Sequence, residues 1–383
     1  MKKVFRSCLT ATGVLTLLLC AQTVFAQTAP ASAAPAPIDR SNMTGEQLYR
    51  SACAACHAPD GRGQPQSVVG FDAPLPDFTS CSFTTPEADA DWSSVVHRGG
   101  RIRALDHRMP SFIDALTDDE IDRVIGYVRG FCTQRGWPRG DLNFPRAFFT
   151  EKAFPENEAV LTTTVANDEL SAITNEFLYE HRIGRRAQYE VNVPFAAQEA
   201  GTGGWNRGLG DVNVALKYAL FDSLRHGFIL SGGGEVTLPT GKESEGLGGG
   251  ATILEGFGMF GKSLPSDGFL HFHAGFEAPT DSEKGAKEMY WRTAVGKTFA
   301  ADNGFGRSWS PMIEILGAKE LEEGVAAEWD VVPQLQVSLS GLQHVLVAAG
   351  VRVPVTERDA RSSSVVVYLL WDWFDGGLFS NWK

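Results

Sequence analysis

The sequence of 383 residues lacks the patterns that mark most enzymes and helical membrane proteins. No Ser-His-Asp set, phosphate-binding loop or paired-carboxylate arrangement stands out in it. Its N-terminal apolar run, from Leu9 to about Leu19, is too short to span a bilayer as a helix. Basic residues are outnumbered by acidic ones, 34 to 46, and the formal charge of −12 makes nucleic acid a poor partner.

Cysteine is scarce, with six in the chain, and two of them form the most informative motif. Cys53 and Cys56 enclose two alanines and precede His57, a C-x-x-C-H run that is the attachment site of a c-type haem. Each thiol can bond one vinyl group of the same haem, and the histidine then ligates the iron. A zinc or redox C-x-x-C is the alternative. Because no second C-x-x-C completes a zinc site, we predict one covalently bound haem c.

The first 26 residues have the pattern of a secretory signal peptide. A basic start precedes the apolar run, and small residues end at Ala26, where cleavage is expected. Lipidation at Cys20 is the alternative, but Leu19 stands where a small residue is needed. The mature chain is therefore predicted to be exported, where c-type haem is attached, and loss of three basic residues brings its formal charge to −15. Such an acidic protein suits cations or basic electron-transfer partners.

The remaining cysteines predict a disulfide. Two of the six leave with the signal peptide and two hold the haem, which leaves Cys81 and Cys132. Two thiols in one small exported domain favour a bridge, and two separate buried thiols are the alternative.

Composition divides the chain into five parts. They are the signal peptide (1–26), an Ala/Pro-rich linker (27–40), a partly helical domain (41–137), a connector containing Phe148 and Phe149 (138–155), and a strand-rich part (156–383). In the helical domain we expect helices over 44–53 and 91–98, and a further helix that begins at a capping box on Thr117.

Met109 is the predicted second axial ligand of the haem iron. Its thioether suits low-spin iron, and Pro110 fixes the chain after it. His97 and His107 are the competing ligands. Residues 41 to 135 resemble the class I cytochrome c family in two places, the haem run and a Met-Pro loop before a final helix. The resemblance implies an all-α domain that carries single electrons and makes no bonds.

The C-terminal part alternates apolar and polar residues, as in 211–220, 269–277 and 333–340. Such period-2 runs are strands with one apolar and one polar face. About twelve segments can be marked, starting near residues 157, 172, 187, 210, 226, 249, 267, 286, 307, 326, 342 and 362. The even number and the alternation predict an antiparallel outer-membrane β-barrel, all-β, apolar outside and polar inside.

Tryptophans near strand ends would supply an aromatic girdle, namely Trp291, Trp309, Trp329, Trp371 and Trp373. A soluble β-sandwich or a lipocalin-like barrel is the alternative, because it alternates in the same way. Two runs in this part resemble barrel proteins grouped under a phenol-degradation or putative-transporter label. They are Gly208-Leu209-Gly210-Asp211-Val212 and the later Leu238-Pro239-Thr240-Gly241.

His271 and His273 share one face of a predicted strand, and with Glu277 they could clasp a metal ion in the lumen. A polar lumen needs polar residues in any case, and we favour that simpler interpretation.

Together these patterns predict a monohaem c-type cytochrome fused to an outer-membrane barrel of a Gram-negative bacterium. The layout is similar to fused cytochrome–porins of iron-oxidising bacteria. It implies one-electron transfer between a periplasmic carrier and a donor or acceptor at the outer membrane, with a metal ion such as Fe(II) as one candidate. The first alternative is a channel for small molecules that has the cytochrome as plug or docking module. An enzyme that oxidises a substrate at an open haem site is a further one, less favoured than electron transfer.

Overall fold

The computed structural model describes residues 39–71, 74–100, 107–167, 171–201, 203–300, 307–339 and 345–372. The predicted signal peptide, nearly all of the predicted linker and Trp373 lie outside these ranges. None of the helices within them is long and apolar enough to cross a membrane.

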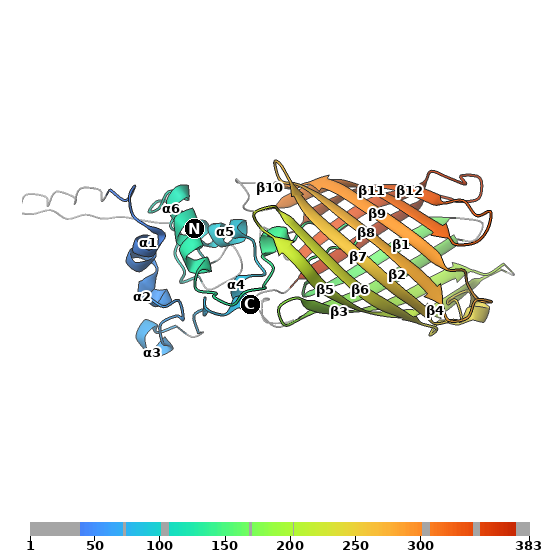
Figure 1. Cartoon of the computed structure of the whole chain (residues 1–383), viewed down its shortest axis with the longest axis horizontal. Helices are drawn as coiled ribbons and strands as arrows, with labels where there is room; N and C mark the ends of the chain where they lie inside the picture. The colour runs from blue at the N-terminus through green and yellow to red at the C-terminus, as the bar shows by residue number, and fades with distance from the viewer. Residues whose placement is uncertain are drawn as a thin grey trace, which may run out of the picture. The chain divides into compact units, whose positions relative to one another are not determined.

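The N-terminal part of the described chain is a small helical domain (Figure 1). Its helices are α1 (Gly45–Ala52), α2 (Ala54–His57), α3 (Gln66–Val69), α4 (Cys81–Thr84), α5 (Asp89–Arg98) and α6 (Asp118–Arg129). Thr44 begins α1 and Thr117 begins α6, each with a full capping box that satisfies free N–H groups of the first turn. The sequence-based expectations for these helices are confirmed within one or two residues.

One apolar cluster holds this domain together. Its buried members are Leu48, Tyr49, Ala54, Phe78, Val96, Leu116, Ile121, Val124, Ile125 and Val128. The helical spacing of the α6 members brings one face of that helix against α1. A disulfide joins Cys81 to Cys132, as predicted, and closes a span of 51 residues across the domain. Cross-links over loops of that length stabilise a small domain mainly by restricting its unfolded chain.

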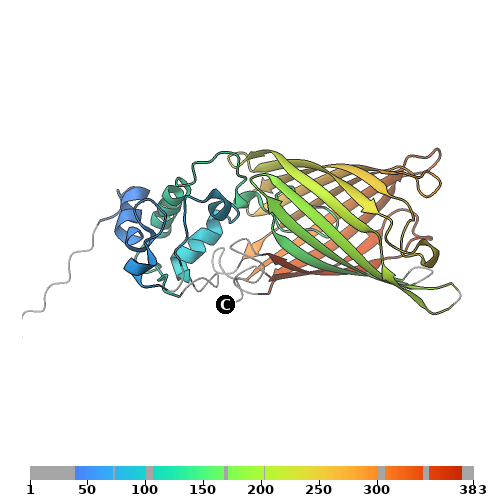
Figure 2. The same ribbon diagram turned by 90° about the horizontal axis from the view of Figure 1, so that it is seen from below.

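The C-terminal part is a closed antiparallel β-barrel, and Figures 1 and 2 show its strands running obliquely along the wall. The strands are β1 (Glu158–Asn167), β2 (Ser171–Ile183), β3 (Ala187–Glu199), β4 (Trp205–Leu209), β5 (Val212–Ser223), β6 (Phe228–Leu238), β7 (Ile253–Leu264), β8 (Gly268–Pro279), β9 (Glu288–Lys297), β10 (Phe299–Ala300), β11 (Ser308–Glu320), β12 (Glu328–Ser338), β13 (Val345–Pro354) and β14 (Ser364–Asp372).

The described strands make up a barrel of twelve strands when each of two interrupted strands is counted once. β4 and β5 both pair with β3 and act as one interrupted strand, and β9 and β10 both pair with β11 in the same way. Pairing of β1 with β14 closes the sheet. Closure removes the free strand edges whose N–H and C=O groups would lack partners in lipid. The predicted antiparallel barrel of about twelve strands is confirmed.

The faces of the barrel have opposite character. On β5, Leu216 and Tyr218 are about half exposed on the outside, whereas the intervening Lys217 is 1% exposed and faces inward. The same alternation places Glu314 of β11 and Gln334 of β12 inside, between outward Ile313, Ile315 and Leu335. An apolar outer face and a polar interior are the reverse of a soluble barrel or sandwich, which rules against that alternative.

Leu216→Arg tests the lipid-facing surface. Leu216 lies near the middle of β5, so an arginine there should destabilise the membrane-inserted barrel by about 2–4 kcal/mol. The matched control is Leu224→Arg, because Leu224 lies beyond the end of β5, where the cost is about 0–1 kcal/mol. Urea titration of the barrel folded into lipid vesicles measures both, and equal effects of the two variants would contradict the assignment.

Candidate functional site

Local helical geometry brings the C-x-x-C-H residues together. Cys53 ends α1 and begins α2, and its carbonyl accepts from the N–H groups of Cys56 (3.1 Å) and His57 (2.9 Å). This single turn places the thiols of Cys53 and Cys56 three residues apart on the same side of the chain. Both thiols are half-buried and neither is in a disulfide.

His57 is buried in an aromatic environment. Its ring stacks on Phe78 with a centroid separation of 4.8 Å, and 9% of the residue is exposed. Burial lowers the pKa of His57 to about 4, so its imidazole is neutral at pH 7, the form that ligates metals. Its Nδ1 atom is buried without a hydrogen-bond partner in the described part of the chain. A buried orphan nitrogen is costly unless a further group or water completes its surroundings.

Tyr49 fixes the backbone under this motif. Its buried hydroxyl donates to the carbonyl oxygens of His57 (3.1 Å) and Ala58 (2.7 Å). Ala58 has a φ of 58°, so the chain reverses directly after the histidine. The two hydrogen bonds from one side chain therefore determine the direction in which His57 is presented.

Met109 packs against the same apolar cluster as Cys53. The N–H of Gly100 donates to the Met109 carbonyl (3.1 Å), and Gly99 has a φ of 81°. A Cβ at Gly99 would lie 2.7 Å from that carbonyl oxygen, so only glycine allows this close approach. The glycine pair that ends α5 also positions the methionine loop.

The competing histidines are placed differently. His97 lies with its Nε2 atom 2.9 Å from Asp118, and His107 is exposed. Two thiols, a neutral imidazole and a thioether beside aromatic side chains are chemically suited to a haem.

The barrel interior contains a site that the sequence analysis missed. Residues 142–156, which are most of the predicted connector (138–155) and the first residue of the predicted barrel, bond with inward-facing side chains of the strands. Arg146 donates to Glu158 (2.6 Å) and Glu180 (2.7 Å), and Lys152 pairs with Glu156 and with Glu158 (3.2 Å). The sequence did contain a signal for this site, because four phenylalanines are unusual in an exposed linker. They are Phe144, Phe148, Phe149 and Phe154.

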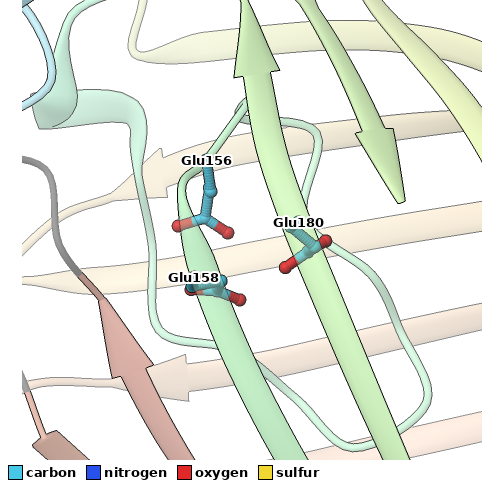
Figure 3. A group of neighbouring side chains, drawn as sticks. All are labelled: Glu156, Glu158 and Glu180. Atoms are coloured by element: carbon cyan, nitrogen blue, oxygen red, sulfur yellow. The ribbon is translucent and has the colours of Figure 1, made fainter. Parts of the chain in front are cut away.

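The carboxylates of Glu156, Glu158 and Glu180 converge at the start of β1 and on the neighbouring β2 (Figure 3). They are the group of described acidic, histidine and cysteine residues whose ligand atoms lie within 4.8 Å of one another. Arg146 and Lys152 pair with them, and Lys217 lies 4.0 Å from Glu180, so the group is part of a buried ion-pair network.

The structure does not bring His271, His273 and Glu277 together as a metal ligand set. Nε2 of His271 lies 3.0 Å from the carbonyl oxygen of Pro145, and Nε2 of His273 lies 2.8 Å from the hydroxyl of Tyr290. Both histidines do face the lumen, as the alternation predicted, but their rings bond to residue 145 and to the wall.

A cavity of about 300 Å³ remains in the lumen beside this segment. Its lining carries more acidic than basic side chains, namely Glu151, Glu176, Glu190, Glu235, Glu255 and Glu277 against Arg146 and Arg292. Tyr290 donates to Glu255, and Asn213 donates to Glu235 at 2.8 Å. Carboxylates concentrated in a confined space attract cations and repel anions.

Comparison with known proteins agrees with the division into two parts. Residues 40–128 match the family model described as cytochrome C oxidase, cbb3-type, subunit III. No curated protein matches the chain. The family match covers the helical domain and implies a haem there, so the chain joins a cytochrome c-like domain to a barrel.

Three solved structures are similar to the barrel part. An outer-membrane channel from Pseudomonas putida F1 is 12% identical, with 60% of this chain and 99% of that chain covered and a TM-score of 0.44. The KdgM porin is 10% identical, covering 56% and 99%, with a TM-score of 0.37. LpxR from Salmonella typhimurium is 9% identical, covering 56% and 100%, with a TM-score of 0.33.

Tyr49→Phe tests the support beneath the C-x-x-C-H motif. Removing the hydroxyl leaves two buried carbonyls with one partner fewer, so the helical domain should lose about 1–3 kcal/mol of unfolding free energy. Tyr127→Phe is the matched control on α6, where the ring packs against Tyr49. Denaturant unfolding followed by near-ultraviolet circular dichroism measures both, and the prediction fails if the two losses are equal.

Proposed function

We propose that this protein is a monohaem c-type cytochrome anchored in the outer membrane by its own barrel, and that it transfers single electrons. The observation that carries the proposal is the buried, neutral His57 directly after two unpaired thiols on one helical turn, inside the region of the family match. Cys53 and Cys56 would hold the haem covalently, with His57 and Met109 as axial ligands.

The side chains around the motif suit electron transfer. A haem supplies a one-electron couple when bound. The neutral His57 needs no proton to leave before it can ligate, and the Met109 thioether favours a higher potential than a second histidine would. The apolar cluster of Phe78, Val96 and Leu116 excludes water from the same region. Two protein ligands leave no open position for a substrate, which favours electron transfer over catalysis.

The proposed location and partners rest on the N-terminal signal-like residues and on the outer surface of the barrel. The signal-like residues 1–26 support export, and the apolar outer wall supports insertion in an outer membrane. Export gives the helical domain periplasmic electron carriers as partners. A small molecule or a metal ion such as Fe(II) is the proposed donor or acceptor at the membrane.

A second candidate function is binding or passage of small cations in the barrel. The excess of carboxylates around the lumenal cavity favours it. This function uses the barrel and not the haem, so the two candidates can be tested separately.

The decisive experiment for the first candidate is haem staining of fractionated cells. The wild-type protein should stain covalently for haem and sediment with outer-membrane lipid. Cys53→Ser/Cys56→Ser should lose the stain yet remain in that fraction, because the barrel is unaltered. Wild-type protein without covalent haem would end the cytochrome proposal, and haem in the soluble fraction would end the proposed anchoring.

Met109→Ala tests the second axial ligand. The variant should lose the sulfur-to-iron charge-transfer band of the oxidised protein, because alanine offers no donor atom. His97→Ala and His107→Ala serve as controls and should retain the band. Survival of the band in Met109→Ala would remove Met109 from the proposed ligand set.

A further inference from the structure

Residues 142–156, here called the lumen segment, bond to the barrel wall around its circumference. Its partners on the wall are Glu158 (β1), Glu180 (β2), Gln188 (β3), Lys217 (β5), Ser231 (β6), His271 (β8), Arg292 (β9), Glu314 (β11) and Tyr368 (β14). A segment lying against one side of the wall could not reach strands on opposite sides. The lumen segment therefore crosses the interior.

Glu314 is the centre of one anchor. Its carboxylate is fully buried and accepts from the backbone N–H groups of Phe148 (2.8 Å), Phe149 (3.1 Å) and Thr150 (2.7 Å). The Thr150 hydroxyl and the Gln334 amide also donate to it. Successive N–H groups aimed at one anion form a strong, charge-assisted set of hydrogen bonds.

Arg146 is the centre of the second anchor, on strands β14, β1 and β2, which follow β11, β12 and β13 in the sheet order. It pairs with Glu158 and Glu180, and Tyr368 donates to its backbone carbonyl at 2.8 Å. Lys217 of the wall, at 3.2 Å from Glu190, donates to the carbonyl of Lys152. Removal of Arg146 would take the nearest cation from two buried carboxylates, leaving Glu158 with Lys152 at 3.2 Å and Glu180 with Lys217 at 4.0 Å, which disfavours the packed arrangement.

Apolar contacts fill the space between the anchors. Leu142 and Phe154 pack with Ala219, Ile229 and Met259 of the wall, each exposed by no more than 1%. In a second cluster, Ala147 packs with Phe269, Ala294 and Met312. Such exposures mean that a water-sized sphere does not reach these atoms from either end of the barrel.

We propose that the lumen segment is a plug that closes a cation pathway through the barrel, and that Glu314 and Arg146 hold it shut. The proposal rests on the second candidate function, passage of cations, and does not require a haem. The acidic cavity is the open part of that pathway, and the segment from Leu142 to Glu156 is the closed part. A whole helical domain is too large for the bore of a twelve-stranded barrel, whereas an extended segment fits.

The test compares conductance in planar bilayers. The full-length wild type should show few or no openings, and Arg146→Ala/Glu314→Gln should increase the open fraction roughly tenfold or more, because charge-assisted hydrogen bonds and an ion pair are lost. The matched control is Arg225→Ala/Glu323→Gln, which makes the same two changes at exposed positions. Heat-modifiable migration on gels verifies that each barrel is folded.

A thiol reporter separates release of the plug from conduction. Ala147→Cys, buried against Phe269, should resist a water-soluble maleimide in the wild-type background and react in the anchor variant. Ser363→Cys, at an exposed position, is the reactive control.

Labelling together with conductance supports the proposal. Absence of both in a folded anchor variant, or large steady conductance of the wild type, overturns the plug. Labelling without conductance overturns the pathway instead, because the segment would have left a barrel that conducts nothing. The failure of the plug and the failure of the channel function are thus distinguishable.

Discussion

The charges inside the barrel need partners, and the arrangement of the lumen depends on meeting that need. A closed barrel with an apolar exterior turns its polar side chains inward, where little water reaches them. Glu158, Glu180 and Glu314 each have an exposed fraction of 1% or less. Unpaired, such carboxylates would be strongly unfavourable. Residues 142–156 supply the cations and N–H groups that they require.

This dependence runs in both directions. The backbone of residues 148–150 lies outside any strand or helix, so its N–H groups lack the usual backbone partners. The Glu314 carboxylate accepts their hydrogen bonds, and they in turn stabilise its buried charge. Arg146 would be costly to bury without Glu158 and Glu180. Segment and wall are therefore parts of one packed interior. Residues 142–156, which the sequence presents as a link between domains, therefore form the packed core of the barrel.

The helical domain uses a different principle on a smaller scale. A domain this small can bury only a limited apolar cluster, and the Cys81–Cys132 disulfide adds to its stability. His57 leaves an orphan nitrogen within that cluster, and the two nearby cysteines are unpaired. A domain whose packing leaves such groups together is suited to a large planar cofactor, and the family match over residues 40–128 implies a haem.

Local patterns in the sequence were enough to predict several features. The capping box at Thr117 specifies a helix start by contacts only three residues apart. Alternation specifies strands and their inward faces, so the inward positions of Lys217 and His271 followed without knowledge of the fold. Cys53, Cys56 and His57 form a contiguous motif, and elimination left Cys81 and Cys132 as a pair. All of these depend on short separations or on counting.

Contacts between distant residues had no such signal. The bonds from residues 148–150 to Glu314 span more than 160 positions, and Tyr368 reaches Arg146 across 222. A metal site of His271, His273 and Glu277 was the less favoured interpretation of one strand, and the contacts of the two Nε2 atoms with Pro145 and Tyr290 could not be read from that strand. By itself the sequence determined the elements, the cysteine pairing and the C-x-x-C-H run, because each follows from near neighbours or from counting cysteines. Only the tertiary structure decided what fills the barrel, because burial pairs each charge with whichever partner the closed wall brings within reach.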